Sequence, residues 1–198
     1  MFGSGYAGLG HEGAAAKAYF GVLRWFNRSV FPWQGRVKHP STDPLNALLS
    51  LTYTLLLNEL TALINAHGLD SSIGFLHQID GNRPSLALDL LEPFRSPMAD
   101  RLVWTLVNRG QFGPEDFEQR SPESGVFLAA HSQRGFFEAY EKWMLSPVVA
   151  AGGLTFRVAL QKEVEAWVAY LRESSGPWTP FSFGAERGGV ANAGTDRL

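Results

Sequence analysis

One histidine and two carboxylates within residues 74–95 have the types and the spacing that could support metal chemistry. The segment reads GFLHQIDGNRPSLALDLLEPFR, with His77 ahead of a short turn and with Asp89 and Glu92 three residues apart. If the chain is helical from Ser85 onward, the two carboxylates share one helix face about a turn apart. Burying like charges among leucines is costly unless a cation compensates them, and imidazole with carboxylate oxygens is a common ligand set for a divalent metal. The spacing alone leaves an alternative open, in which His77 caps a loop and Glu92 is a solvated helix residue.

The composition restricts the metals and partners that the chain can bind. Its 198 residues are 45% hydrophobic and 13% aromatic, enough for one domain with a sizeable core. Because cysteine is absent, thiolate sites and disulfides are excluded, and any metal has to be a hard cation bound by His, Asp and Glu. The formal net charge of -2 means that nucleic-acid binding would rely on a local basic patch.

The N-terminal sequence MFGSGYAGLGHEG carries no targeting signal. It lacks a charged region followed by an apolar one, and no run approaches the ~18 apolar residues that a membrane helix needs. We therefore expect a soluble, cytoplasmic protein.

The elements that must position these residues are predicted to be helices. Over residues 43–68 apolar residues recur at spacings of three and four, with Asp43 as the N-cap, a proline at the first helical position and a glycine as the stop. The pattern returns over residues 86–109, where Pro93 and Pro97 predict a kink or a break. Three further helices are expected at residues 11–26, 132–145 and 154–172.

The fold class that follows is all-α, because no sustained alternation of apolar and polar residues with hairpin turns is present. The helical domain is expected to cover residues 1–183, and the glycine-rich residues 184–198 are expected to form a flexible tail. The first helix is rich in alanine, which favours close packing in the centre. The irregular loop over residues 29–42 combines Pro, Gly and Trp with basic residues, and a long loop of this kind is more often functional than not.

Three blocks in order along the chain carry a resemblance to a known family: HEGAAAKAYF, DPLNALLSLTYTLL and GFLHQIDGNRPSLALDLLEPFR. Together they resemble the CRISPR-associated integrase "Cas one", the metal-dependent nuclease of spacer acquisition. In that family a glutamate of an E-G-x-x-A block, the histidine of a G-F-x-H block and an acidic residue of a D-L-x-E/D block bind one divalent cation. The resemblance implies that Glu12, His77 and Glu92 bind Mg²⁺ or Mn²⁺ and are catalytic, with Asp89 as an auxiliary ligand.

The chemistry of such a site is phosphodiester cleavage or transesterification, because a hard cation can neutralise a scissile phosphate and polarise an attacking hydroxyl. The resemblance implies that foreign DNA fragments, the CRISPR repeat array and the "Cas two" subunit are partners. The family usually begins with a β-rich domain that builds a homodimer. This chain opens a few residues before the Glu12 block, so that domain is expected to be absent and its homodimer is not expected here. The alternative function is a truncated, non-catalytic helical module that binds DNA or a partner.

Further residues are predicted to support the metal site or to contact DNA. Asn46 and Tyr53 are seven apart, so they share one helix face and could support the metal site by hydrogen bonds. For Tyr53 the alternative is a core residue whose hydroxyl is satisfied. A basic set is expected to contact DNA phosphates, with a solvated face or ion pairs to the carboxylates as the alternative. This set consists of Arg24, Arg28, Arg36, Lys38, Arg83 and Arg95.

Overall fold

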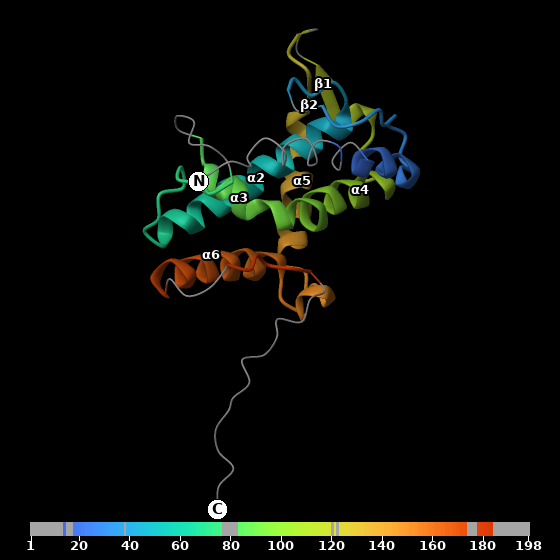
Figure 1. The fold of residues 1–198 in the computed structure, drawn as a ribbon. Coiled ribbons are helices and arrows are strands. Elements are labelled where there is room, and N and C mark those ends of the chain that lie inside the picture. Colours follow the sequence, from blue (N-terminus) through green and yellow to red (C-terminus); the bar gives the residue numbers. More distant parts are fainter. Residues whose placement is uncertain are drawn as a thin grey trace, which may run out of the picture.

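The fold is all-α, as the sequence predicts, with one small hairpin added (Figure 1). The computed structural model describes residues 14, 18–37, 39–76, 83–119, 121, 123–173 and 178–183. Two of the predicted metal ligands, Glu12 and His77, and the predicted DNA contact Lys38 lie outside the described residues, as do residues 184–198.

Helix α2 (Pro44–Ala66) forms the centre of the fold. Asp43 is extended, and its carboxylate accepts the backbone N–H of Asn46 at 2.9 Å, so it caps the first turn as predicted. The helix contacts α3, α4, α6, β2 and η2. Its fully buried apolar side chains, each of which contributes about 1.5–3 kcal/mol relative to exposure, are Leu45, Leu48, Leu49, Leu56, Leu60 and Ile64.

Helix α2 is also long and apolar enough, by length and composition, to cross a membrane. This corrects the expectation that no segment reaches that limit. A third of this apolar window is buried inside the fold, and the leucines named above are among the buried residues of the helix.

The break predicted at the two prolines takes the form of a change in helix type. Pro93 and Pro97 have no N–H to donate, so each removes a bond of the α-helical ladder. The chain remains helical between Glu92 and Asp100, but the number of residues per turn changes. The elements in order are α3 (Ser85–Leu91), the 3-10 turn η1 (Glu92–Phe94), the π-helix η2 (Arg95–Asp100) and α4 (Arg101–Asn108).

The N-terminal helix lies on the surface over residues 18–26. It ends at Phe26 as predicted, but the expectation that it packs in the centre is wrong for these residues, since Trp25 is 78% and Phe26 61% exposed. Asn108 of α4 fastens the helix end: its amide donates to the carbonyl of Phe26 at 2.9 Å and accepts the N–H of Arg28 at 2.8 Å.

The irregular loop that follows is predicted correctly, and part of it belongs to the core. Phe31 is 4% and Trp33 6% exposed. The indole of Trp33 donates to the carbonyl of Phe20 at 2.9 Å and meets Trp104 of α4 edge to face, with ring centroids 5.3 Å apart. The loop therefore connects the N-terminal helix to α4 through aromatic packing.

An antiparallel hairpin of β1 (Phe117–Gln119) and β2 (Val126–Leu128) projects from one end and was not predicted. Each strand has three residues, too few for the alternation that predicts a strand. The N–H of Val126 donates to the carbonyl of Ser41 at 2.7 Å. Gly125 has φ +78°, and a Cβ there would lie 2.8 Å from the same Ser41 oxygen, so glycine is required for this contact.

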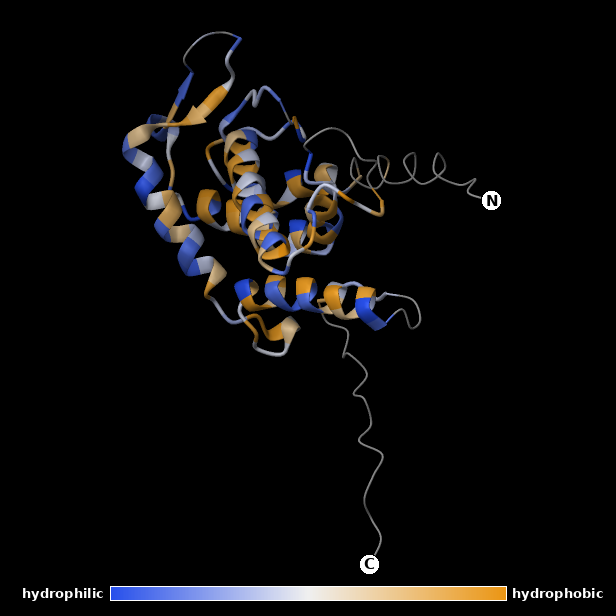
Figure 2. Cartoon of the chain, turned by 90° about the vertical axis from the view of Figure 1, so that its left-hand side faces the viewer, coloured by the Kyte–Doolittle hydropathy of each residue, from blue (hydrophilic) through white to orange (hydrophobic). Residues whose placement is uncertain are grey.

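Helices α5 (Ala130–Met144) and α6 (Phe156–Glu173) occupy nearly the predicted ranges. Both are amphipathic, and Figure 2 shows hydrophilic and hydrophobic positions alternating along them. Helix α6 lies below α3 in Figure 1, and its buried face includes Leu160, Val164 and Trp167. Buried Glu163 of α6 accepts the N–H of Phe181 at 2.9 Å, which holds residues 178–183 against the helix.

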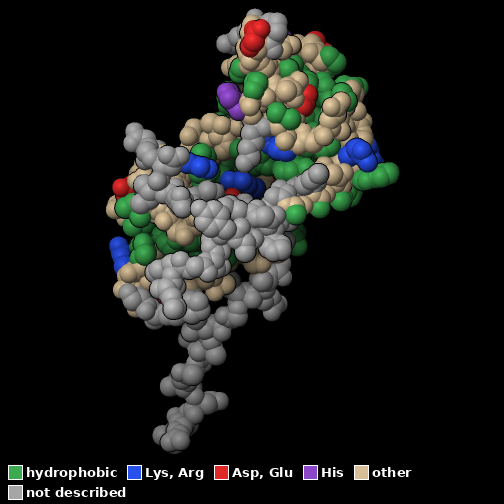
Figure 3. Space-filling model, turned by 45° about the horizontal axis from the view of Figure 1, so that its top comes forward, with side chains coloured by type: hydrophobic (Ala, Val, Ile, Leu, Met, Phe, Trp, Pro, Cys, Tyr) green, Lys and Arg blue, Asp and Glu red, His purple; other side chains and the backbone are tan. Residues whose placement is uncertain are grey.

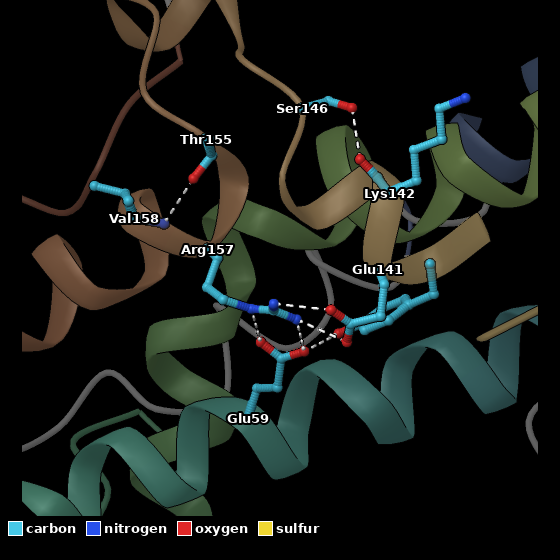
Figure 4. Close-up of polar contacts among 8 residues, drawn as sticks. Glu59, Glu141, Lys142, Ser146, Thr155, Arg157 and Val158 are labelled. Carbon is cyan, nitrogen blue, oxygen red and sulfur yellow. Dashed lines mark hydrogen bonds and ion pairs between the residues drawn. The ribbon is translucent and has the colours of Figure 1, made fainter. Parts of the chain in front are cut away.

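Arg157 of α6 joins α2 and α5 through two carboxylates (Figure 4). Its guanidinium donates to Glu59 at 3.0 and 3.2 Å and to Glu141 at 2.9 and 3.0 Å. The buried hydroxyl of Tyr140 donates to Glu59 at 2.9 Å. Burial, and then the charge of Glu59, raise the pKa of Tyr140 above its ordinary value, and the bond from Arg157 lowers the pKa of Glu141. One polar cluster thus fixes three helices.

Replacing Glu59 by alanine should lower the free energy of unfolding by about 1–3 kcal/mol, because the buried Tyr140 hydroxyl loses its acceptor and Arg157 keeps one carboxylate of two. Urea denaturation followed by circular dichroism measures this change. The matched control is Arg134→Ala, which breaks an exposed pair to Glu138 at 2.8 Å and should leave the midpoint nearly unchanged. Equal losses in both variants would contradict the role of the cluster.

Candidate functional site

The described part of the predicted metal site lies on α3 and η1, where its two carboxylates have different surroundings. Asp89 of α3 is 2% exposed, whereas the side chain of Glu92 at the start of η1 is 35% exposed. The guanidinium of Arg95 lies 3.0 Å from Oε1 of Glu92. The two carboxylates occupy consecutive helical turns as the spacing predicts, and Glu92 is the more accessible of the two.

Asp89 fixes the backbone of the two residues that directly precede His77. Its Oδ2 accepts the N–H of Phe75 at 2.6 Å and that of Leu76 at 2.8 Å. A Cβ on Gly74 would lie 2.7 Å from the same oxygen, and the Cβ of Ser85 would be 2.8 Å away, so only glycine allows this approach. The G-F-x-H block is therefore tied to α3 by a buried carboxylate.

The convergence of Glu12, His77 and Glu92 stays a prediction, because two of the three residues lie outside the described part. Within the residues that the structure does describe, no group of three or more His, Asp or Glu side chains could hold a metal ion. The predicted ligand that is described, Glu92, keeps a partly exposed side chain.

Asp100, the last residue of η2, accepts hydrogen bonds from two tyrosines and was not singled out from the sequence. It is 1% exposed. The hydroxyl of Tyr53 of α2 donates to its Oδ1, and the hydroxyl of Tyr19 of the N-terminal helix donates to its Oδ2 at 2.9 Å. Tyr19 also lies 2.7 Å from the hydroxyl of Ser96. Asp100 thus joins the N-terminal helix, α2 and η2. The sequence signal is one acidic residue in the apolar run PMADRLVW.

The positive charges of Arg36 and Arg95 favour the charged form of Asp100, and both arginines lie over the ring of Tyr53. The guanidinium carbons of Arg36 and Arg95 lie 5.4 and 5.8 Å from the ring centroid of Tyr53. Arg36 also donates to Asn46 at 2.9 Å. Burial raises the pKa of Asp100, and the bonds from the tyrosines partly offset this; burial also lowers the pKa of Arg36. Asn46 and Tyr53 share a helix face as predicted, since both contact Arg36. Arg95, which lies over Tyr53, also pairs with Glu92.

The other predicted DNA contacts lie mainly on the surface. Arg24 and Arg83 are exposed, and Arg24 stacks on Trp25 at 5.7 Å. Arg28 is exposed just beyond the end of the N-terminal helix. Figure 3 shows several Lys and Arg side chains on the face that it presents.

A comparison with known families identifies the fold. Residues 8–142 match the family described as "CRISPR associated protein Cas1". The chain belongs to the Cas1 family. The resemblance carried by the three sequence blocks is therefore confirmed.

Individual relatives agree with this assignment. The protein "CRISPR-associated endonuclease Cas1 1" of Moorella thermoacetica is 43% identical over 136 residues, which make up 67% of this chain and 39% of that protein. The chain thus spans well under half the length of this curated Cas1 relative.

Two solved structures share the fold. The "Casposase bound to integration product" matches with a TM-score of 0.79 at 25% identity, over 96% of this chain and 56% of the casposase chain. A chain of the "Cas6-RT-Cas1--Cas2 complex" matches with a TM-score of 0.79 at 22% identity, over 93% of this chain and 20% of that one, and at this identity only the fold is shared. The helical architecture of this Cas1 chain is thus confirmed.

Replacing Asp89 by alanine should lower the free energy of unfolding by about 2–3 kcal/mol, because two backbone N–H groups lose a charged acceptor. Hydrogen exchange at the amides of Phe75 and Leu76 should also accelerate. The control is Glu92→Ala, which removes a partly exposed side chain and should leave both amides protected. Unchanged exchange in Asp89→Ala would contradict the anchoring role.

The stability contributed by Asp100 should depend on pH. Burial raises its pKa above the ordinary 3.8, so the folded state binds this proton more tightly than the unfolded chain does. The stability that comes from this proton is fully present below pH 3.8 and is lost as the pH rises through the pKa of the folded state. Asp100→Asn, neutral at every pH, should therefore gain stability relative to the native protein as the pH rises above 3.8. Urea unfolding across this range measures the difference; a constant difference would show that the pKa is not raised.

Proposed function

We propose that this chain is the catalytic helical domain of a metal-dependent DNA endonuclease and integrase of CRISPR spacer acquisition. The observation that carries the proposal is the pairing of an accessible Glu92 with a buried Asp89 that anchors the turn before His77. Membership of the Cas1 family supports the reaction class. The reaction is phosphodiester cleavage and transesterification on DNA.

The residues present fit a hard divalent cation, Mg²⁺ or Mn²⁺. Glu12, His77 and Glu92 would hold it, since such ions accept carboxylate oxygen and imidazole nitrogen. Asp89 acts as an auxiliary residue, because its Oδ2 already accepts two backbone N–H groups. When bound, the ion neutralises charge on the scissile phosphate and activates the attacking hydroxyl or water.

Arg95, which lies over the ring of Tyr53, would provide a positive charge for an anion at the same site. The guanidinium of Arg95, 3.0 Å from Glu92, places a positive charge beside the carboxylate. Tyr53 lies under both Arg95 and Arg36, and its hydroxyl is held by Asp100. These arginines are therefore oriented before DNA arrives, and a phosphate near Glu92 would be bound by Arg95.

The partners that we propose are DNA and the Cas2 subunit, acting in the cytoplasm. The DNA substrates are foreign fragments and the CRISPR repeat array. Two of the similar solved structures support this, since one is a casposase bound to an integration product and the other is a complex that contains Cas2. The phosphate contacts proposed are Arg24, Arg28, Arg36, Lys38, Arg83 and Arg95.

Mn²⁺ should raise the melting temperature of the chain, and a chelator should reverse the effect, because a ligand bound only by the folded state stabilises it. At a hundredfold excess over the dissociation constant the gain is about 2.7 kcal/mol. His77→Ala and Glu92→Gln should lose this response. His131→Ala and Glu173→Gln, both at exposed positions, should keep it. A response that survives in His77→Ala would remove His77 from the site.

Replacing His77 or Glu92 by alanine should abolish Mn²⁺-dependent cleavage or strand transfer on a labelled branched duplex while leaving DNA affinity nearly intact. Metal ligands act on the transition state, whereas basic residues also bind the ground state. Gel assays of product and anisotropy assays of binding, run on the same proteins, separate the two effects. Intact binding without any activity in the native chain would favour a non-catalytic binding module.

A further inference from the structure

Residues 178–183, which follow α6, form a segment with no role in the site described above. They read WTPFSF, and we call them the aromatic strap after Trp178, Phe181 and Phe183. The strap contacts two parts of the chain that lead to candidate metal ligands. Its first aromatic ring meets the G-F-x-H turn, and the other two meet η1.

At one end, the strap contacts the ring of Phe75, which stands two residues before His77 in the sequence. Trp178 meets this ring edge to face, with centroids 5.2 Å apart. Trp167 of α6 stacks on the same ring, with centroids 4.7 Å apart and 26° between the ring planes. The two tryptophans meet edge to face at 4.9 Å. Each of the three rings therefore contacts the other two in a geometry that aromatic pairs prefer.

The ring of Phe75 depends on these two tryptophans for its position. It is 42% exposed and lies outside the buried core, to which Trp167 belongs and against which Trp178 packs. Within the described residues, its ring contacts are those with the two tryptophans. The bonds to Asp89 come from the backbone of the turn, so they do not fix the direction of this side chain.

At its other end, the strap packs on Phe94 of η1, which stands two residues after Glu92. Phe181 stacks on this ring, with centroids 5.3 Å apart and 24° between the ring planes. Phe183 meets the same ring edge to face at 5.7 Å. Phe94 is completely buried, so these contacts belong to the core. The strap therefore packs against the short element that carries Glu92 as well as against the turn that precedes His77.

Helix α6 holds the strap between these two contacts. The buried carboxylate of Glu163 accepts the N–H of Phe181 at 2.9 Å. Trp167 is four residues further along, so it shares this face of α6. Helix α6 lies below α3 in Figure 1, and Asp89 of α3 binds the backbone of Phe75. The turn is thus held by α3 through its backbone and by α6 and the strap through its ring.

A ligand carried by a turn binds its metal only in those molecules in which the turn has the right arrangement. The apparent dissociation constant rises by the inverse of that fraction. A turn that is already ordered also avoids the entropy cost of becoming ordered on binding. The contribution of one aromatic pair corresponds to about a 2- to 12-fold change in such a population. Contacts with two tryptophans are therefore large enough to control the affinity of the site.

We propose that the aromatic strap, together with Trp167, positions His77 for metal binding by holding residues 74–76 against α3. Phe75 and Trp178 are positioning residues, because they act through His77 and not on the ion or on DNA. The link to metal affinity rests on the proposed function, whereas the holding of the turn does not.

The test is the affinity of the full chain for Mn²⁺, measured by titration calorimetry. Phe75→Leu and Trp178→Leu should each bind Mn²⁺ at least about fivefold more weakly, because leucine keeps an apolar side chain but removes the ring. Trp178→Phe keeps a ring and should restore most of the affinity. The double variant Phe75→Leu/Trp178→Leu should bind no more weakly than Phe75→Leu, because the two changes remove a shared contact.

The matched control is Phe112→Leu, which removes a ring contact elsewhere in the core. Phe112 follows α4 and lies 6.1 Å from the ring of Phe136 of α5, and neither residue is in a segment that carries a candidate ligand. This variant should have a lower melting temperature but native affinity for Mn²⁺. A loss of affinity as large as that of Trp178→Leu would overturn the proposal, as would native affinity in Trp178→Leu or losses that multiply in the double variant.

Hydrogen exchange in the metal-free chain tests the holding of the turn separately. In Trp178→Leu the amides of Phe75 and Leu76 should exchange at least about fivefold faster, whereas in Phe112→Leu they should stay protected. Unchanged exchange in Trp178→Leu would overturn the positioning role. If the native chain binds no Mn²⁺, the proposed function fails, and the exchange rates alone decide whether the strap holds the turn.

Discussion

A carboxylate removed from water has to accept hydrogen bonds, and this constraint determines where separate segments of the chain meet. Asp89 binds the backbone of residues 75–76, and Asp100 binds tyrosines of two other helices. Glu163 binds the backbone of Phe181. All three are at most 2% exposed. Losing any of these partners would leave a buried charge unsatisfied, so the three contacts define one arrangement of the segments.

The same constraint separates the enclosed carboxylates from the one that stays partly exposed. Asp89 and Asp100 are enclosed and committed to other parts of the chain, whereas the side chain of Glu92 remains 35% exposed beside Arg95. The π-helix η2 carries Arg95 at its first position and Asp100 at its last. It therefore connects the accessible acid with the buried cluster, in keeping with the tendency of π-helical insertions to mark functional sites.

Local sequence signals predicted the elements, because those signals act over a few residues. The cap at Asp43, the proline break after Glu92 and the apolar periodicity of α2 each depend on neighbours within about two turns. These local signals did not predict contacts between residues that are far apart in the sequence. Asp100 meets a tyrosine 81 residues away, which no pattern within one helix reveals.

The position of the first helix and the presence of the hairpin were not predicted for similar reasons. The alanine-rich composition of the first helix indicated close packing, but residues 18–26 lie on the surface, where Asn108 of α4 holds their end. The three-residue strands of the hairpin are held by their pairing and by the contact of Val126 with Ser41, which no local pattern reveals. For the site, the sequence pointed to Asp89 and Glu92 as candidates, whereas only the structure shows that Asp89 anchors a turn and that the side chain of Glu92 stays partly exposed.

The most direct test of the central claim is a crystal structure of the chain grown with Mn²⁺, using anomalous scattering to locate the metal. The account predicts one strong peak about 2.0–2.6 Å from a carboxylate oxygen of Glu92 and from side-chain atoms of Glu12 and His77. Asp89 should still accept the N–H groups of Phe75 and Leu76. A fully occupied peak elsewhere, or His77 on the opposite side of the domain from Glu92, would contradict it.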